Sequence, residues 1–347
     1  MEKKSVISIK KSSFKFIAKS NTTLLDAALK ENINLPHGCK SGSCGSCIAN
    51  VIEGNIKNKG PETTTISNTI LLCQSYAASK KIVLEYPIDK LNMIKVHSKN
   101  KKVINPKDFL LQVVGNKSVT PLIKELSFFV PPKLNLQFLA GAHMEIYNNS
   151  DYISKKYSIV NSPGKLNNLK KNILKFLITK NDRKGISQFI HNEVKVGDIL
   201  RVKGPFFSFQ YSINNNKPIL GIAGGSGLSP ILSIIKDILH KNIDLSIMLF
   251  LSVRNREEIL EMDTLHKLKE EYKSFSFKIA LTREKPIQNS QFLFGRVNNS
   301  LQKIFKDLST HQILIAGSEK FVETSYDHVI KLSANKNNIF YEKFTKN

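Results

Sequence analysis

The stretch Pro36-His37-Gly38-Cys39-Lys40-Ser41-Gly42-Ser43-Cys44-Gly45-Ser46-Cys47 holds three of the four cysteines of this 347-residue chain, and Cys73 is the fourth. A C-x4-C-x2-C run with a remote fourth cysteine is the plant-type spacing that holds a [2Fe–2S] cluster. Two irons bridged by sulfide need four thiolates, so one tight loop supplies three of them and a distant segment supplies the last. We therefore predict Cys39, Cys44, Cys47 and Cys73 as metal ligands.

The residues between these cysteines are mostly glycine and serine. Small side chains let backbone N–H groups approach the sulfurs, which stabilises a negative cluster and tunes its potential. Two alternatives remain open at this stage, a zinc site and unligated structural cysteines. Zinc sites generally pair two C-x2-C knuckles, whereas this chain has one such pair.

The N-terminus, Met1 to Ser5, is followed by mixed polar residues instead of an apolar signal core, so we expect a cytoplasmic protein. Disulfides do not suit that reducing compartment. The window from Pro218 to Ile235 is uncharged and approaches the length of a membrane span. Because four glycines, two prolines and three serines interrupt it, it predicts a buried strand, a glycine turn and the start of a helix. We expect no membrane span.

Length and composition predict two or three folded domains, since a domain averages about 150 residues and 41% of the chain is hydrophobic. The first, residues 1–90, opens with alternating runs at 6–9 and 14–17 that predict a hairpin. A helix follows, which the Thr23 hydroxyl can cap with Asp26 three residues later. The polar, lysine-rich segment 91–106 is predicted as a linker.

The remaining chain divides into two patterns. Residues 107–212 alternate short β-like runs with Gly, Pro and Asn turns, which predicts a small antiparallel barrel. Residues 213–347 alternate strand and helix patterns, which is typical of a parallel sheet flanked by helices. The fold class is thus multidomain, α+β and α/β. The predicted strands of the last domain are 219–223, 245–251, 277–281 and 313–316, and its predicted helices are 231–239 and 260–272.

The formal charge of +24 raises a nucleic acid as a partner. That charge consists of 46 Lys and only 6 Arg, with no Arg in residues 1–150 and no dense basic block. Arginine is the residue favoured for bidentate recognition of bases and phosphates. We therefore expect a compositional bias and no nucleic-acid partner, and keep a basic nucleic-acid-binding protein with a structural metal as the alternative of another class.

The first domain resembles ferredoxin through the cysteine stretch and the later Leu72-Cys73-Gln74, over about residues 5–87. The resemblance implies a β-grasp fold around the cluster. One departure is electrostatic: residues 1–90 hold 13 Lys and 7 acidic residues, a balance of +6, whereas plant-type ferredoxins are usually acidic. An acceptor protein that docks here is expected to present an acidic surface.

In the barrel, Lys155-Lys156-Tyr157-Ser158 resembles the R-x-Y-S flavin motif of the ferredoxin–NADP reductase superfamily. An isoalloxazine ring needs an aromatic to pack against, a small hydroxyl near N5 and a cation for the diphosphate. The resemblance implies FAD, with Tyr157, Ser158 and Lys155 in those roles. Lysine replaces the family's arginine and offers a point charge instead of a bidentate fork.

A second flavin segment is implied by Lys184-Gly185-Ile186-Ser187, which is similar to the family's G-x-x-S turn with the glycine displaced by one position. Free N–H groups at a helix start suit a phosphate. Gly185 and Ser187 are therefore predicted to bind the cofactor. The alternative is that Ser187 is a plain helix cap.

After the predicted strand 219–223 comes Gly224-Gly225-Ser226-Gly227-Leu228-Ser229-Pro230. Glycines at a strand-to-helix turn let backbone approach a pyrophosphate, so a nicotinamide dinucleotide, NADH or NADPH, is expected here. Ser229 can cap the helix and Pro230 suits its first position. The predicted dinucleotide-binding residues are Gly224, Gly225, Gly227, Pro230, Arg254 and Gly317.

Near the reacting ring, the family resemblance implies Ser158 and Glu342 as catalytic residues, although Glu342 can also be read as a solvated C-terminal acid. Ala316 stands where family members commonly carry Cys. Arg254 and Arg256 could meet a 2′-phosphate, while Glu257 and Glu258 could accept from a free ribose hydroxyl, and we favour NADH.

The domain order resembles the reductase components of bacterial ring-hydroxylating and related oxygenases, and more closely the CDP-6-deoxy-Δ3,4-glucoseen reductases. The implied activity is an NAD(P)H-dependent oxidoreductase that passes electrons from NAD(P)H through FAD and the [2Fe–2S] cluster to a protein acceptor. The acceptor is expected to be a dehydratase, or alternatively an oxygenase.

Overall fold

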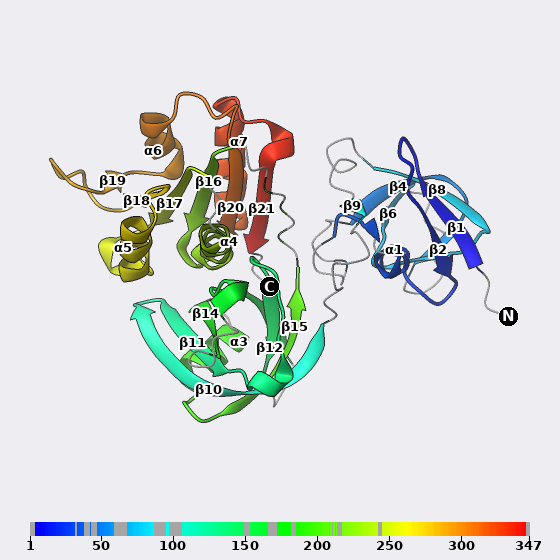
Figure 1. The fold of residues 1–347 in the computed structure, drawn as a ribbon, viewed down its shortest axis with the longest axis horizontal. Helices are drawn as coiled ribbons and strands as arrows, with labels where there is room; N and C mark the ends of the chain where they lie inside the picture. Colours follow the sequence, from blue (N-terminus) through cyan, green and yellow to red (C-terminus); the bar gives the residue numbers. More distant parts are fainter. Residues whose placement is uncertain are drawn as a thin grey trace. The chain divides into compact units, whose positions relative to one another are not determined.

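The structure is a computed structural model. It describes residues 4–31, 33–37, 42, 47–58, 68–86, 95–96, 106–148, 153–165, 172–181, 185–207, 209, 211, 213, 217–241 and 245–344. The chain forms two compact units, Met1–Val103 and Ile104–Asn347 (Figure 1). No helix among the described residues is long and apolar enough to cross a membrane.

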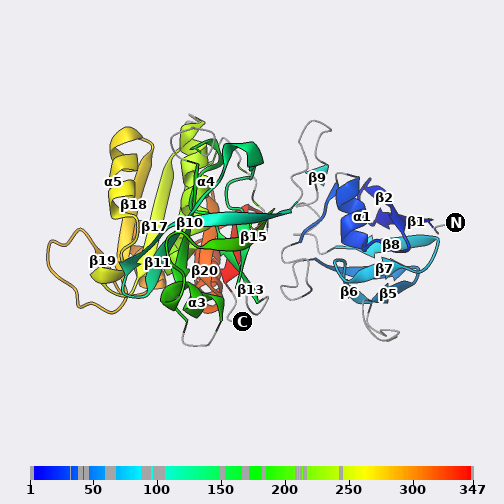
Figure 2. The ribbon, with the colours of Figure 1, turned by 90° about the horizontal axis from the view of Figure 1, so that it is seen from below.

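The first unit is a mixed five-stranded sheet in the order β2-β1-β8-β4-β6, with α1 packed against it (Figure 2). β1 and β2 form the predicted antiparallel hairpin, and β1 also pairs in parallel with β8. This is the β-grasp arrangement that was expected. The elements are β1 (Lys4–Ile9), β2 (Lys15–Lys19), α1 (Leu24–Lys30), β3 (Ile33–Asn34), β4 (Ile48–Glu53), β5 (Ile56–Asn58), β6 (Thr69–Leu71), β7 (Ser75–Ala77), β8 (Lys81–Glu85) and β9 (Lys95–Val96).

Local sequence explains the ends of this unit. Thr23 caps α1 as predicted, because its hydroxyl accepts from the Asp26 backbone N–H at 3.1 Å. The short strand β9 lies inside the predicted linker 91–106, yet it pairs with β3. Part of the lysine-rich segment therefore belongs structurally to the first unit.

The second unit begins with a six-stranded antiparallel sheet in the order β13-β12-β15-β10-β11-β14. A bridge between Ile159 and Phe176 brings the two edges together, so the sheet closes into the predicted barrel. Its elements are β10 (Lys107–Thr120), β11 (Ile123–Phe129), η1 (Pro132–Leu134), β12 (His143–Tyr147), β13 (Ser154–Ser158), η2 (Pro163–Lys165), β14 (Ile173–Thr179), α3 (Ile186–Asn192) and β15 (Ile199–Phe206).

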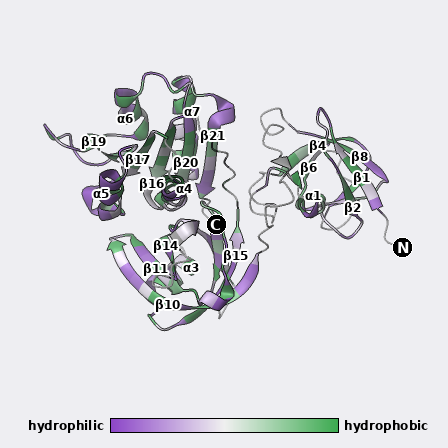
Figure 3. Ribbon diagram, viewed as in Figure 1, coloured by the Kyte–Doolittle hydropathy of each residue, from purple (hydrophilic) through white to green (hydrophobic). Residues whose placement is uncertain are grey.

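A six-stranded parallel sheet in the order β19-β18-β17-β16-β20-β21 completes the second unit. Its central strands are apolar, as a parallel sheet buried on both faces requires, whereas the covering helix α5 is strongly polar (Figure 3). Its elements are β16 (Ile219–Gly224), η3 (Gly225–Gly227), α4 (Leu228–His240), β17 (Ile247–Val253), η4 (Arg256–Glu258), α5 (Met262–Glu271), β18 (Phe275–Leu281), β19 (Leu293–Phe294), α6 (Val297–Ile304), β20 (Gln312–Ser318), α7 (Glu319–Lys331), η5 (Lys336–Asn338) and β21 (Ile339–Phe344).

Helices cover both faces of this sheet. On one face, side chains of α6 and α7 join the core formed by Leu220, Ile222 and Phe250. On the other face, α4 lies close to Gly221, because a Cβ placed there would lie 2.7 Å from Ile231. The uncharged window 218–235 is therefore a strand, a glycine turn and a helix, as predicted.

Candidate functional site

The cluster-binding region of the first unit is described at two of its four predicted ligands, Cys47 and Cys73. Cys39 and Cys44 lie outside the described residues. β4 begins immediately after Cys47, and Cys73 sits in the turn after β6. Because β4 and β6 pair antiparallel with Ile48 opposite Leu71, this register brings the two cysteines together.

The two sulfurs fit a shared metal centre. Both cysteines are buried, neither is in a disulfide, and their Sγ atoms lie 3.3 Å apart. That separation exceeds the ~2.05 Å of a disulfide, yet it is close enough for both thiolates to bind one metal ion. Gly42, in the predicted loop, adopts a φ of +89°, and a Cβ there would lie 3.1 Å from the Gln74 side chain. Glycine therefore suits this position, because it adopts a positive φ without strain and has no side chain to crowd Gln74.

The predicted flavin residues lie on β13. Lys155 and Tyr157 lie on one face of this strand and Ser158 lies on the other. β12 pairs antiparallel with β13, which places His143 opposite Ser158. The Tyr157 hydroxyl is buried and has no hydrogen-bond partner among the described residues, and burial raises its pKa. An orphaned buried hydroxyl of this kind fits a bound polar group.

Lys155 is half-buried and makes no ion pair within the described chain. Its burial lowers the pKa of the ammonium, because a partly desolvated cation without a counterion is disfavoured. A diphosphate would supply the missing anion. The residues present therefore fit the expected FAD.

The second flavin segment starts α3. Gly185 is the residue that precedes the helix, and it leaves open space where a Cβ would stand. Ser187 lies buried in the first turn, and its hydroxyl accepts from the Asn181 backbone N–H at 3.3 Å. Ser187 is thus not the helix cap of the alternative interpretation, and its hydroxyl instead holds the preceding loop.

The glycine loop between β16 and α4 fits a dinucleotide. Gly225 has a φ of +54° with nothing within 4 Å of a Cβ position, whereas Gly224, Gly227 and Gly317 pack closely against their neighbours. The helix begins at Leu228, after a 3-10 turn, and not at Pro230 as the Ser229 cap had predicted. Because residues 225–227 already form a 3-10 turn, Ser229 lies inside the first turn of α4, and its buried hydroxyl has no partner among the described residues.

The two predicted catalytic residues meet between the barrel and the parallel sheet. Ser158 Oγ donates to Glu342 Oε2 at 3.1 Å, although the two residues stand 184 positions apart. Both are buried, at 8% and 9% exposure, so Glu342 is not a solvated C-terminal acid. Ala316, fully buried on β20, is the register partner of Glu342 on β21.

The sequence did not point to His143, which lies beside this pair. Its Nδ1 is 4.0 Å from Glu342 Oε1, and its ring stacks on Phe206 at a centroid distance of 5.6 Å. Burial, reinforced by Lys156, lowers the pKa of His143 to about 3, so the ring is neutral. In the sequence, a histidine in a strand of alternating polarity is indistinguishable from an ordinary core residue. No motif includes His143, so sequence analysis could not identify it.

Arg254, at the end of β17, is held by Glu258. Its Nε lies 3.1 Å from Glu258 Oε1, and its backbone N–H donates to Glu258 Oε2 at 3.1 Å. Arg256 is held in the same way by Glu284, with Nε 3.1 Å from Oε2. The two arginines considered for a 2′-phosphate thus already have carboxylate partners.

Family models match all three parts of the chain. They are a 2Fe-2S iron-sulfur cluster binding domain over residues 7–78, an oxidoreductase FAD-binding domain over 110–211 and an oxidoreductase NAD-binding domain over 222–327. The chain is an iron–sulfur flavoprotein reductase. Its cofactors are a [2Fe–2S] cluster, FAD and a nicotinamide dinucleotide, and it is an NAD(P)H-dependent oxidoreductase. The first of these domains decides against the zinc alternative.

Similar proteins agree with this class. The reductase is 26% identical over 325 residues to the terephthalate 1,2-dioxygenase reductase component 2 of Comamonas sp., covering 92% of this chain and 90% of the relative. It is 31% identical over 232 residues to the CDP-6-deoxy-L-threo-D-glycero-4-hexulose-3-dehydrase reductase of Yersinia pseudotuberculosis, 65% of each chain. In fold it matches the Amycolatopsis cytochrome P450 reductase GcoB with a TM-score of 0.76 at 19% identity, covering 99% of both chains.

A charge reversal tests the flavin role of Lys155. In the reductase, Lys155→Glu places a carboxylate at the half-buried position predicted to meet the diphosphate, so FAD should be lost on dialysis while the cluster's visible bands remain. The measurement is flavin released per protein, against Lys195→Glu, which reverses an exposed charge of the same barrel and should keep FAD. Equal flavin content in the two variants would assign the diphosphate charge to another residue.

The buried state of His143 predicts a pH dependence. Because the folded state lowers the pKa from 6.5 to about 3, the unfolded chain takes up a proton that the folded one excludes. Its contribution to stability is constant above pH 6.5 and falls by about 1.4 kcal/mol per pH unit below it. NMR of histidine-labelled protein, assigned with His143→Gln, should show this ring neutral as the pH falls through 6.5, and a resonance titrating there would contradict the burial.

Proposed function

We propose that the reductase passes electrons from NADH through FAD to its [2Fe–2S] cluster and from there to a protein acceptor. When bound, FAD supplies the conversion between the two-electron chemistry of the nicotinamide and the one-electron chemistry of the cluster. We also propose the domain limits 1–90, 107–212 and 213–347, with 91–106 as a linker that adds β9 to the first unit. The cytoplasmic location remains part of the same proposal.

The observation that carries this proposal is the contact between Ser158 and Glu342. It joins the strand with the flavin motif to the last strand of the dinucleotide-binding sheet, at a buried point. A hydroxyl is both donor and acceptor, so Ser158 can bind Glu342 and still orient toward a ring atom. The neutral His143 beside Glu342 adds no positive charge to the carboxylate.

Binding residues flank this reacting point on both sides. Lys155, two residues before Tyr157 on the same strand, is proposed to hold the flavin diphosphate, with Gly185 and Ser187 at the second segment. Gly225 offers an open backbone position for the dinucleotide pyrophosphate. The proposed dinucleotide-binding set is Gly224, Gly225, Gly227, Pro230, Arg254 and Gly317, and the proposed cluster ligands are Cys39, Cys44, Cys47 and Cys73.

The acceptor is proposed to be a dehydrase or an oxygenase, following the names of the relatives reported above. The higher identity favours a dehydrase of the kind served by the Yersinia reductase, while the longer coverage supports an oxygenase. The balance of +6 over residues 1–90 favours an acidic docking surface on either acceptor.

Loss of one cluster ligand tests the order of electron flow. Cys47→Ser replaces a soft thiolate and should destroy or strongly destabilise the cluster, while the second unit keeps its own cores. NADH-dependent reduction of ferricyanide should persist, because the flavin site can support it directly. Reduction of cytochrome c or of a protein acceptor should fall by at least about tenfold.

Cys73→Ser is the matched variant, because it removes the second described thiolate from the same buried pair. It should reproduce the same separation of the two activities. Equal loss of ferricyanide and cytochrome c reduction, with FAD still bound, would show that the cluster is not the exit for electrons.

The arginine–glutamate pairs predict the donor. Glu258 and Glu284 already pair with Arg254 and Arg256. A 2′-phosphate at these arginines would therefore meet two neutralised cations and be repelled by the two carboxylates. We expect kcat/KM to be at least about tenfold higher for NADH than for NADPH. Glu258→Gln should narrow this ratio by releasing Arg254. A preference of the unaltered reductase for NADPH would overturn the inference.

A further inference from the structure

One serine of the dinucleotide-binding half contacts the chain segments that adjoin both strands of the flavin site. Ser233 lies in the middle of α4 and is fully buried. Its hydroxyl donates to the Asn161 carbonyl oxygen at 2.5 Å and accepts from the Gly141 backbone N–H at 3.3 Å. A serine inside a helix usually bonds back to its own helix or faces water, whereas this one reaches into the barrel.

The two barrel atoms that Ser233 contacts lie close in sequence to His143 and to Ser158. Gly141 precedes β12 and stands two residues before His143, while Asn161 follows β13 and stands three residues after Ser158. The Ile159 N–H donates to the Ala142 carbonyl at 2.8 Å, so the two segments are also joined to each other. A single hydroxyl therefore contacts both the segment that leads to His143 and the segment that follows Ser158.

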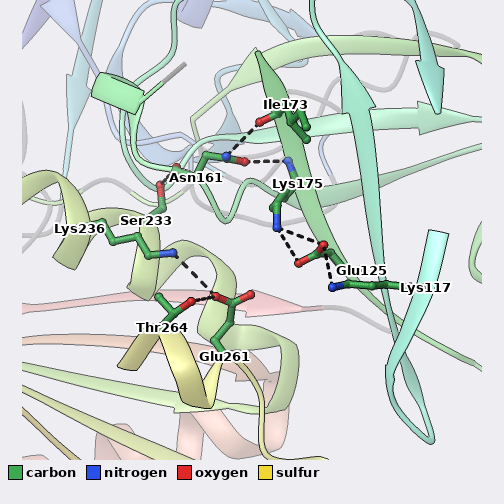
Figure 4. A network of polar contacts seen from close by, with 9 residues as sticks. All are labelled: Lys117, Glu125, Asn161, Ile173, Lys175, Ser233, Lys236, Glu261 and Thr264. Carbon is green, nitrogen blue, oxygen red and sulfur yellow. Dashed lines mark hydrogen bonds and ion pairs between the residues drawn. The ribbon is translucent and has the colours of Figure 1, made fainter. Parts of the chain in front are cut away.

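Asn161 is itself fixed by the barrel. Its Nδ2 donates to the Ile173 carbonyl at 3.0 Å, and its Oδ1 accepts from the Lys175 N–H at 2.7 Å. Lys175 in turn binds both carboxylate oxygens of Glu125 at 3.1 Å. Figure 4 shows this line of contacts from β11 through β14 and Asn161 to Ser233. The carbonyl that Ser233 meets is thus held at a defined position.

Gly141 allows the close approach from the other side. It has a φ of +79°, and a Cβ there would lie 3.1 Å from Ile234 Cδ1, the side chain that follows Ser233. The missing side chain lets α4 lie directly against this loop. Backbone conformation, side-chain packing and a hydrogen bond all join α4 to the same point of the barrel.

We propose that Ser233 is a positioning residue that sets the distance between the dinucleotide and the flavin. α4 starts directly after the glycine loop 225–227, and a helix transmits position along its axis because its backbone is rigid over two turns. By holding α4 to Gly141 and Asn161, Ser233 fixes the glycine loop relative to β12 and β13. This inference rests on the proposed hydride transfer between the two cofactors, for which a misplacement of 1 Å can cost about 100-fold in rate.

Other contacts also join α4 and its glycine loop to the barrel, but each reaches a different point. Ser162 Oγ lies 3.1 Å from His240 Nδ1 at the far end of the helix. Lys236 points away from the barrel to Glu261, with Nζ 3.9 Å from Oε2. Ser226, in the middle of the glycine loop, accepts from the Thr179 hydroxyl at 2.8 Å. Among these contacts, those of Ser233 reach both the segment before β12 and the segment after β13.

The test compares Ser233→Ala with Ser325→Ala in the complete, cofactor-loaded protein. Ser325 is a matched control, since it is also fully buried, in helix α7, which packs against the same sheet. Its hydroxyl has no partner among the described residues. Amide hydrogen exchange at Gly141 should accelerate about fivefold in Ser233→Ala, the factor that one net hydrogen bond represents, and stay unchanged in Ser325→Ala. This readout needs no turnover.

Rapid mixing with NADH supplies the second measurement. The limiting rate of flavin reduction should fall at least about fivefold in Ser233→Ala, while the dissociation constant of NADH changes less than about twofold. If Ser233 only stabilised the fold, its substitution would lower the free energy of unfolding without lowering the limiting rate more than it changes the dissociation constant of NADH. If the unaltered protein transfers no hydride from NADH, the proposed function fails, and the Gly141 exchange still tests the contact by itself.

Unchanged Gly141 exchange, or a limiting rate equal to that of the unaltered protein, overturns the proposal. Should Ser233→Ala not fold, Ser233→Cys keeps the shape of the side chain at a slightly larger size, with a weaker donor and acceptor. It should show both effects at reduced size. Values of Ser233→Cys identical to those of the unaltered protein then overturn the proposal as well.

Discussion

The antiparallel pairing of β12 with β13 is the interaction on which the rest of the reductase depends. It sets His143 opposite Ser158 and Met144 opposite Tyr157, so the residues of the flavin motif gain neighbours that the motif does not contain. β15, on the other side of β12, adds Phe206 opposite His143. The barrel thereby carries a buried, mostly apolar wall against which one hydroxyl and one carboxylate meet.

Local chemistry made much of this predictable from sequence. The cysteine spacing, the Thr23 cap and the glycine turn before α4 are short-range features, and each carries its physical reason within a few residues. The spacing even implied that Cys47 and Cys73 share a centre, although only the register of β4 and β6 explains how they approach. The strand patterns likewise predicted the four central strands of the parallel sheet, because buried strands read as continuous apolar runs, whereas the edge strands β19 and β21 were not predicted.

What the sequence could not predict depends on contacts between distant segments. Ser158 and Glu342 were each named from a motif, but nothing local indicates that they hydrogen-bond. His143 and Ser233 were missed because a histidine in a strand and a serine in an apolar helix both look like packing residues. The cap at Ser229 was wrong for a local reason: three residues from Gly225 already turn helically, so the helix starts earlier than the usual Ser-Pro signal indicates.

The close packing of the glycines beside the dinucleotide loop has a thermodynamic consequence. A Cβ on Gly227 would lie 2.2 Å from the Ala316 carbonyl oxygen, and a Cβ on Gly224 or Gly317 would lie 2.8 Å from the Phe321 ring. The loop is therefore wedged between β20 and α7 by the chain's own atoms, and a ligand need not order it. Little conformational entropy is lost when a nucleotide arrives, so binding carries a smaller ordering cost and association needs no rearrangement of the loop. A donor that must be exchanged after every two electrons benefits from such a rigid cradle.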